Sequence, residues 1–205
     1  MSDERPENLS AAEALEELTK GNRRFVEEVV ERPHADRMRR IELAKGQKPF
    51  ATIITCADSR VPVELLFDQG LGDLFVIRVA GNIADDAILG SVEYASMFLG
   101  VNVVVVMGHR SCGAVSAAVD YLNTDGAATG THIDALIDAI RPAVRAVKSD
   151  GDEDLVERSV RMNATMVAAE VRTSEPVLAD LAEQGVTIQP AYYDLESGEV
   201  SWLPS

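Results

Sequence analysis

The chain has 205 residues, 46% of them hydrophobic, and a formal net charge of -15 at pH 7. This length and composition predict one domain with a substantial core, and no apolar stretch is long enough to span a bilayer. The negative charge would repel nucleic acids and anionic membrane surfaces, so we expect neither as a partner, and we expect a cytoplasmic location because no basic and apolar leader pattern is present.

The first 48 residues predict a helical arm. Residues 1–8 are polar and expected to be mobile. Ser10 and Glu13 have the spacing of a capping box, and Pro33 ends the helix that they begin. Between Ser10 and Pro33, apolar residues recur at helical spacing: Ala14, Leu15, Leu18, Phe25, Val26, Val29 and Val30. Such a helix needs a surface to pack on, so we expect it to lie across the domain or to reach over a partner subunit.

A second, shorter helix is predicted from Met38 to Ala44, closed by Gly46. His34 lies in the charged loop between the two helices, and we expect it to be solvated, as a lone loop histidine usually is. These segments make up the arm, residues 1–48, and residues 49–205 make up the core of the same domain.

In the core, short apolar runs alternate with helical patterns. Strands are predicted near 50–55, 73–79, 101–107 and 186–193, and helices near 62–68, 85–99, 113–122, 132–148, 152–172 and 174–184. Residues 123–130 predict a loop, and Glu199–Trp202 predicts a short edge strand that returns through Ser197-Gly198. This alternation is typical of an α/β fold with a mainly parallel central β-sheet and helices on both faces, here with an antiparallel edge strand.

Reactive side chains follow two of the predicted strands. Cys56, Asp58 and Arg60 occupy alternate positions after the first strand, and His109 and Cys112 follow the third. Open parallel sheets bind ligands at the carboxyl ends of their strands, so both groups are expected at the same edge. The two cysteines are the only ones in the chain and do not form a Cys-x-x-Cys pair. One site that uses both sulfurs is the simplest interpretation.

Two sulfurs and one imidazole nitrogen form a ligand set that suits zinc and leave one tetrahedral position for water or substrate. The alternative is a closed site in which Asp58 is the fourth ligand. Cys112, at the first turn of a helix, would have its thiolate stabilised by unpaired backbone N–H groups. Arg60 is expected to hold Asp58 in a charge-assisted pair, either to orient hydroxide on the zinc or as a purely structural ion pair.

The two motifs, Cys-x-Asp-Ser-Arg at 56–60 and Gly-His-x-x-Cys-Gly at 108–113, closely resemble those of the beta class of carbonic anhydrases. The likeness continues through the stretches 67–73, 78–82, 90–95 and 193–195 with 197–198, so it covers nearly the whole chain. It implies zinc-dependent, reversible hydration of carbon dioxide to bicarbonate and a proton, with one zinc ion per subunit.

The resemblance also implies a role for each residue of the two motifs. Cys56, His109 and Cys112 would bind the zinc, and Asp58 and Arg60 would form the dyad that orients the zinc-bound hydroxide. In a closed state of such enzymes the aspartate leaves the arginine for the fourth zinc position. We expect Asp58 to bond Arg60 and leave the zinc open near or above neutral pH.

Further pocket residues follow from the same resemblance. Gln47 would donate a hydrogen bond to bound substrate, and Phe75 and Tyr94 would line an apolar pocket. Independently of the resemblance, Gly113 is expected to let the backbone approach the site closely, because it has no side chain. Family members share pocket residues between subunits, which implies a homodimer or a homotetramer built as a dimer of dimers. Ile53 stands where a bicarbonate-regulated subgroup has tryptophan, so the resemblance is to the plant-like, non-allosteric subgroup.

Two other functions stay open on sequence grounds. Relatives on the same scaffold hydrolyse carbonyl sulfide or carbon disulfide, and nothing in this sequence favours that reaction. A non-catalytic member would be a scaffold or a bicarbonate-binding subunit with a closed metal site. The presence of Asp58, Arg60 and Gln47 favours an active enzyme over the scaffold.

Overall fold

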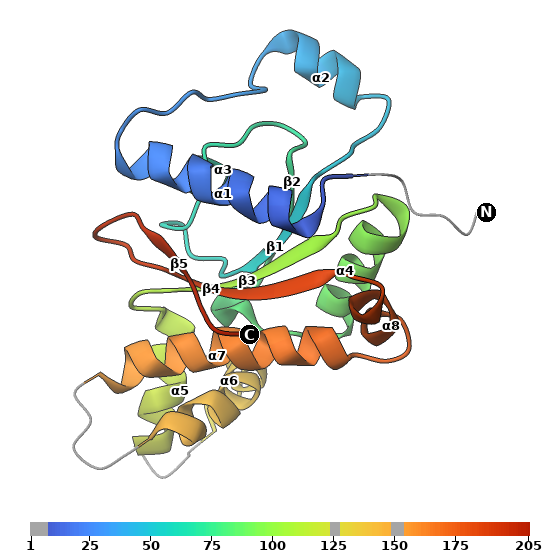
Figure 1. The fold of residues 1–205 in the computed structure, drawn as a ribbon. Helices are drawn as coiled ribbons and strands as arrows, with labels where there is room; N and C mark the ends of the chain where they lie inside the picture. The colour runs from blue at the N-terminus through green and yellow to red at the C-terminus, as the bar shows by residue number, and fades with distance from the viewer. Residues whose placement is uncertain (1–7, 124–127, 149–153) are drawn as a thin grey trace.

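The computed structural model describes residues 8–123, 128–148 and 154–205. Within these residues a five-stranded sheet with the order β2-β1-β3-β4-β5 forms the centre of the molecule (Figure 1). Strands β1 (Ala51–Thr55), β2 (Leu74–Arg78), β3 (Val103–His109) and β4 (Thr187–Tyr193) are parallel, and β5 (Val200–Trp202) pairs antiparallel with β4. The predicted mainly parallel sheet with an antiparallel edge strand is confirmed.

Helices cover both faces of this sheet, as predicted (Figure 1). They are α1 (Ala11–Val26), α2 (Arg37–Leu43), α3 (Val63–Leu66), α4 (Asp86–Phe98), α5 (Gly113–Asn123), α6 (Ile133–Val147), α7 (Leu155–Thr173) and α8 (Leu178–Glu183), with a 3-10 turn η1 at Ala80–Asn82. Most of the predicted mobile N terminus, positions 124–127 of the predicted loop and the first two positions of the predicted helix 152–172 lie outside the described residues. None of the described helices is both long and apolar enough to cross a bilayer.

Alternate residues of β3 face two different cores, which explains its continuous valine run. Val105 and Met107 pack on one face with α1 and α3, whereas Val104 and Val106 pack on the other with α4, α7 and α8. A parallel strand that is buried on both faces needs apolar residues at every position. The strand ends then carry the polar and metal-ligating residues.

Helix α1 lies across the sheet, which confirms the first of its two expected placements. Its capping box is formed, with Ser10 N donating to Glu13 Oε2 at 2.9 Å. A Cβ on Gly21 would lie 1.8 Å from the carbonyl oxygen of Phe67, so only glycine allows this close approach. The expected continuation of the helix to Pro33 is wrong, because α1 ends at Val26 and Glu28 has a left-handed φ of 58°.

A buried carboxylate holds the chain where it leaves α1. Asp68 accepts hydrogen bonds from Arg24 Nε at 2.6 Å and from the backbone N–H groups of Glu31 at 3.0 Å and Arg32 at 2.9 Å. Burial acts to raise the pKa of Asp68, but the hydrogen bonds from Glu31, Arg24 and Arg32 together outweigh it and hold that pKa below its usual range. The chain after α1 is therefore fixed by polar contacts rather than by further helix.

His34 is exposed to solvent, as we expected, but it also has a partner that the sequence did not indicate. Its Nδ1 lies 2.8 Å from both carboxylate oxygens of Asp73, which is buried and also accepts a hydrogen bond from Gly70 N. A buried carboxylate needs such partners, and this need recruits the histidine from a distant loop. Residues of the arm are thereby attached to the start of β2.

Two predicted helices are shorter in the structure than expected. The helix predicted at 62–68 is the single turn α3, and the helix predicted at 174–184 begins only at Leu178. Pro176 disfavours helical backbone at the residue before it, which explains the late start of α8. The other predicted elements agree with the structure to within a few residues.

Candidate metal centre

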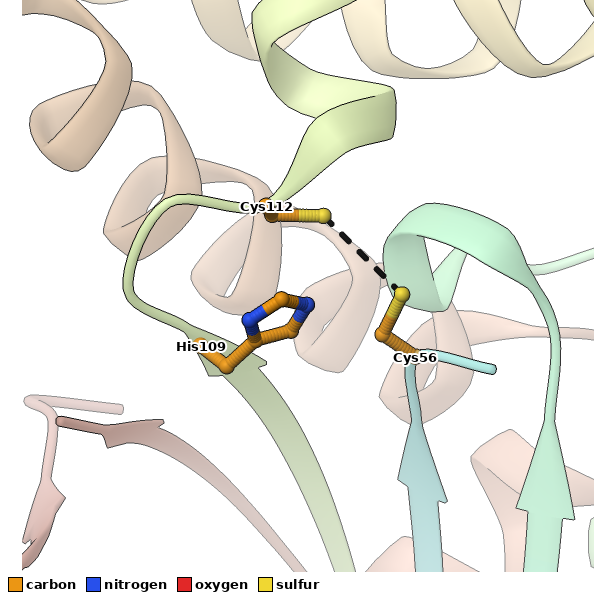
Figure 2. A group of neighbouring side chains, drawn as sticks. All are labelled: Cys56, His109 and Cys112. Carbon is orange, nitrogen blue, oxygen red and sulfur yellow. Dashed lines mark hydrogen bonds between the residues drawn. The ribbon is translucent and has the colours of Figure 1, made fainter. Parts of the chain in front are cut away.

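Three metal-ligating side chains meet at the carboxyl ends of β1 and β3 (Figure 2). Cys56 follows β1, His109 is the last residue of β3, and Cys112 directly precedes α5. Their ligand atoms lie within 4.8 Å of one another, and the two sulfurs are 4.0 Å apart. Because β1 and β3 are neighbouring parallel strands, two motifs that are far apart in sequence open at the same edge. The structure thus brings together the three side chains that the sequence assigned to one site.

The imidazole of His109 is oriented for coordination. Its Nδ1 donates to the carbonyl oxygen of Arg110 at 2.9 Å, which fixes the tautomer and leaves a lone pair on Nε2. Nε2 is buried and has no hydrogen-bond partner among the described residues. A buried nitrogen acceptor without a partner is costly, and a metal ion at this position would satisfy it.

Contact between the two thiols shifts the pKa values of both, in opposite directions. Contact with Cys112 is the main cause that lowers the pKa of Cys56, helped by His109 and by the N–H of Gly81 at 3.3 Å and opposed by burial. The same contact and burial raise the pKa of Cys112, against the backbone N–H groups at the first turn of α5. The pair therefore loses its first proton easily and its second reluctantly. A divalent cation is the partner that would stabilise both thiolates, so this donor set fits zinc.

The carboxylate of Asp58 lies beside this group but faces Arg60. Arg60 Nε and Nη2 donate to its two oxygens at 2.9 and 2.7 Å, and Arg60 N donates to Oδ1 at 2.8 Å. These bonds hold the pKa of Asp58 well below its usual range. Asp58 Oδ2 is 3.8 Å from His109 Nε2, and Arg78 Nη2 donates to the Asp58 carbonyl at 2.6 Å. In the structure Asp58 is therefore paired with Arg60 and does not join the three ligands.

Of the residues expected to bind substrate, Gly113 adjoins a ligand, whereas Gln47 lines a cavity that none of the three ligands reaches. Phe75 on β2 and Tyr94 on α4 have ring centroids 6.2 Å apart, and Tyr94 is 47% exposed. Gln47 is exposed and lines a cavity of about 530 Å³ whose walls, residues 43–47 and Gly72, include none of the three ligands. Gly113 is the first residue of α5, adjacent to Cys112.

Sequence reasoning missed the support that α7 gives to the site. Glu157 accepts a hydrogen bond from Ser111 N, and the buried Asn163 donates to the carbonyl oxygen of Gly81 at 2.9 Å. Val160 lies on the same side of the helix, where a Cβ on Gly108 would come within 2.7 Å of it. The spacing of 157, 160 and 163 along one helix face was the available signal, but nothing local tied that face to the metal motifs.

Comparisons with known proteins agree with one another. A family model described as "Carbonic anhydrase" matches residues 51–200. The curated protein "Carbonic anhydrase 2" of Mycobacterium tuberculosis is 40% identical over 191 residues, which cover 93% of this chain and 92% of that protein.

Solved structures share the fold. The beta-carbonic anhydrase CcaA superposes with a TM-score of 0.71 at 28% identity, covering 93% of this chain and 95% of that one. One of the structures described as two tetrameric beta-carbonic anhydrases of Sordaria macrospora superposes with a TM-score of 0.69 at 24% identity, covering 80% of this chain and 85% of that one.

Proposed function

This chain belongs to the beta class of carbonic anhydrases, and we propose that it hydrates carbon dioxide reversibly to bicarbonate and a proton, using one zinc ion per subunit. The observation that supports this most directly is the Asp58–Arg60 pair beside three buried ligands, Cys56, His109 and Cys112. A structural metal site would need no oriented carboxylate at its edge. A catalytic site needs one, because the attacking oxygen has to be oriented.

Zinc held by the three ligands would lower the pKa of water, so that a hydroxide nucleophile forms near neutral pH. Asp58 accepts the hydrogen bond of the attacking oxygen and thereby turns a lone pair toward the carbon of the substrate. Arg60 keeps this carboxylate ionised and in one orientation through two parallel N–H donors. The hydroxide oxygen bonds to the carbon while one C=O π bond breaks and its electron pair moves onto oxygen, which gives bicarbonate. The proton lost from water passes to the buffer.

We infer that the substrate pocket is completed by a second copy of the chain. Carbon dioxide is apolar and needs a dry wall, for which Phe75 and Tyr94 are candidates, while Gln47 would donate to an oxygen of bicarbonate and Gly113 would leave room for it. Gln47 lies apart from the three ligands in its own chain, and Tyr94 is half exposed with Phe98 packed against it. In the arm (residues 1–48), α2 has no buried residue and exposes Met38 and Ile41.

These exposed groups predict a dimer, or a dimer of dimers, in solution. Tyr94→Asp is expected to weaken the assembly because it places a charge among apolar side chains that the interface would bury. Light scattering at several concentrations checks this. Asp138→Ala, which removes one side chain of an exposed ion pair with Arg141 on α6, is the control. A wild-type chain that stays monomeric at micromolar concentration would contradict the shared pocket.

The decisive experiment measures zinc content and stopped-flow hydration of carbon dioxide on the same wild-type and Asp58→Ala samples across pH. We expect one zinc per subunit in both, and a kcat lowered by ~10²–10⁴-fold in the variant, the usual range for losing a positioned proton acceptor. Asp138→Ala serves again as the control, since it removes an exposed aspartate that, like Asp58, is paired with an arginine.

Other outcomes would favour the two alternatives. Equal and negligible rates from zinc-loaded wild-type and Asp58→Ala protein would favour a non-catalytic scaffold. Faster release of sulfide from carbonyl sulfide or carbon disulfide than hydration of carbon dioxide would favour a sulfide-releasing hydrolase.

We further propose a cytoplasmic location, because Cys56 and Cys112 are both free thiols, and cell fractionation tests it.

A further inference from the structure

A carboxylate on α7 reaches into the loop that carries two of the three metal ligands. Glu157 Oε1 accepts a hydrogen bond from Ser111 N at 2.9 Å, and Oε2 accepts one from the hydroxyl of Tyr192 at 2.6 Å. Glu157 is half-buried in the first turn of α7, where the helix N-terminus favours a negative charge. With both oxygens bonded, its side chain has little freedom to move.

The residue that Glu157 holds has a strained backbone. Ser111 has a φ of 53°, a left-handed conformation that is strained for a residue with a side chain, and it directly precedes Cys112. Its carbonyl oxygen accepts from Arg60 Nη2 at 3.3 Å. Glu157 therefore holds Ser111 through the N–H group of Ser111, and Arg60 holds it through the C=O group of Ser111. The direction in which Cys112 leaves the loop depends on this backbone.

Tyr192 holds the other carboxylate oxygen of Glu157. It is buried on β4, next to Gly108 in the sheet register, and the guanidinium of Arg161 lies 3.7 Å from its ring centroid. Burial, and then the neighbouring Glu157, raise the pKa of Tyr192, so its hydroxyl remains a donor over the whole working pH range. A continuous set of contacts thus runs from β4 through α7 to the ligand loop and to Arg60.

We propose that Glu157 is a positioning residue of the metal centre. Through the backbone of Ser111 it keeps Cys112 in a ligating orientation. It also keeps in place the Ser111 carbonyl group, to which Arg60 donates. Arg60 in turn holds the carboxylate of Asp58. The proposal rests on the proposed zinc site, but it concerns this chain's own residues and needs no turnover to be tested.

The test compares Glu157→Ala, Glu157→Gln and Tyr192→Phe with wild type. Zinc release to a chromophoric chelator is timed, and the visible spectrum of the cobalt(II)-substituted protein reports the geometry of the sulfur ligands. Glu157→Ala is expected to bind zinc about 10–100-fold more weakly and to shift the sulfur-to-cobalt bands. Glu157→Gln should recover most of both, because its amide oxygen still accepts from Ser111 N. Tyr192→Phe should weaken zinc binding and shift the sulfur-to-cobalt bands by amounts between those of the two Glu157 variants.

Glu170→Ala is the matched control, an acid removed from the same helix on its exposed side. The proposal is overturned if folded Glu157→Ala, melting as the control does, releases zinc and absorbs as wild type. If Glu157→Ala does not fold, a wild-type result for Tyr192→Phe in both measurements overturns it. If the wild-type chain takes up zinc but does not hydrate carbon dioxide, only the proposed function is overturned. If it takes up neither zinc nor cobalt, the proposed function and the positioning role of Glu157 are both overturned.

Discussion

Cys112→Ala is expected to lose stoichiometric zinc and to lower the kcat/KM for carbon dioxide hydration by at least ~10³-fold, because water without the metal has a pKa far above neutrality. Of the three ligands that meet here, Cys56 and His109 would remain, and two ligands do not make a stable zinc site. The fold should survive, since the carboxyl end of β3 is held by its pairing with β1 and β4. Atomic absorption on desalted protein and stopped-flow assay measure the two effects.

Ser116→Ala provides the control for this change. Ser116 lies one turn further along α5, and its hydroxyl donates only to the carbonyl oxygen of Cys112 at 3.1 Å. It should keep one zinc per subunit and nearly wild-type turnover. Near-normal zinc content and hydration in Cys112→Ala itself would show that the metal, if needed, is held elsewhere.

Asp68→Asn is expected to destabilise the fold by about 3–5 kcal/mol at neutral pH, the usual cost of removing one charge of a buried pair. The amide oxygen can replace one acceptor, but its NH₂ group would face one of the donors at Arg24, Glu31 or Arg32. Denaturant unfolding followed by circular dichroism measures the difference. Glu16→Gln is the control, because Glu16 pairs with Lys20 in an exposed i, i+4 contact and should change stability by less than about 0.5 kcal/mol.

This difference should depend on pH in a defined direction. The pKa of Asp68 is lowered in the folded chain, so its ionised form stabilises the fold fully above the unfolded pKa of about 4. The advantage of wild type over Asp68→Asn should therefore be constant near neutrality and shrink as the pH falls through the lowered pKa. An advantage that grows toward acid pH would mean that Asp68 is held in its neutral form.

The sequence predicts those parts of the site that depend on local pattern. Cys56 and His109 stand at the ends of apolar runs, and parallel pairing then puts both at one edge. Contacts between distant segments have no such signature. Glu157 looks like any acid in the first turn of a helix, and nothing near it in the sequence indicates that Ser111 and Tyr192 fold against it.

The same limit explains what the sequence did not show of the arm. The apolar stripe of α1 continues to Val30, but the end of the helix is set by Asp68, more than thirty positions later. His34 is exposed as expected, but its partner Asp73 lies 39 positions away and left no local signal in the sequence. The pocket residues Phe75, Tyr94 and Gln47 were named from a resemblance, and their use in the reaction stays a proposal.

The two sulfurs of the metal centre are 56 positions apart in the chain. An ion held by both would act as a reversible cross-link between the first and third strands, closing a long loop whose freedom contributes to the unfolded state. Binding only to the folded chain, it would raise resistance to heat and proteolysis in proportion to the logarithm of its free concentration. Metal supply in the surroundings would then govern the lifetime of this protein as well as its activity.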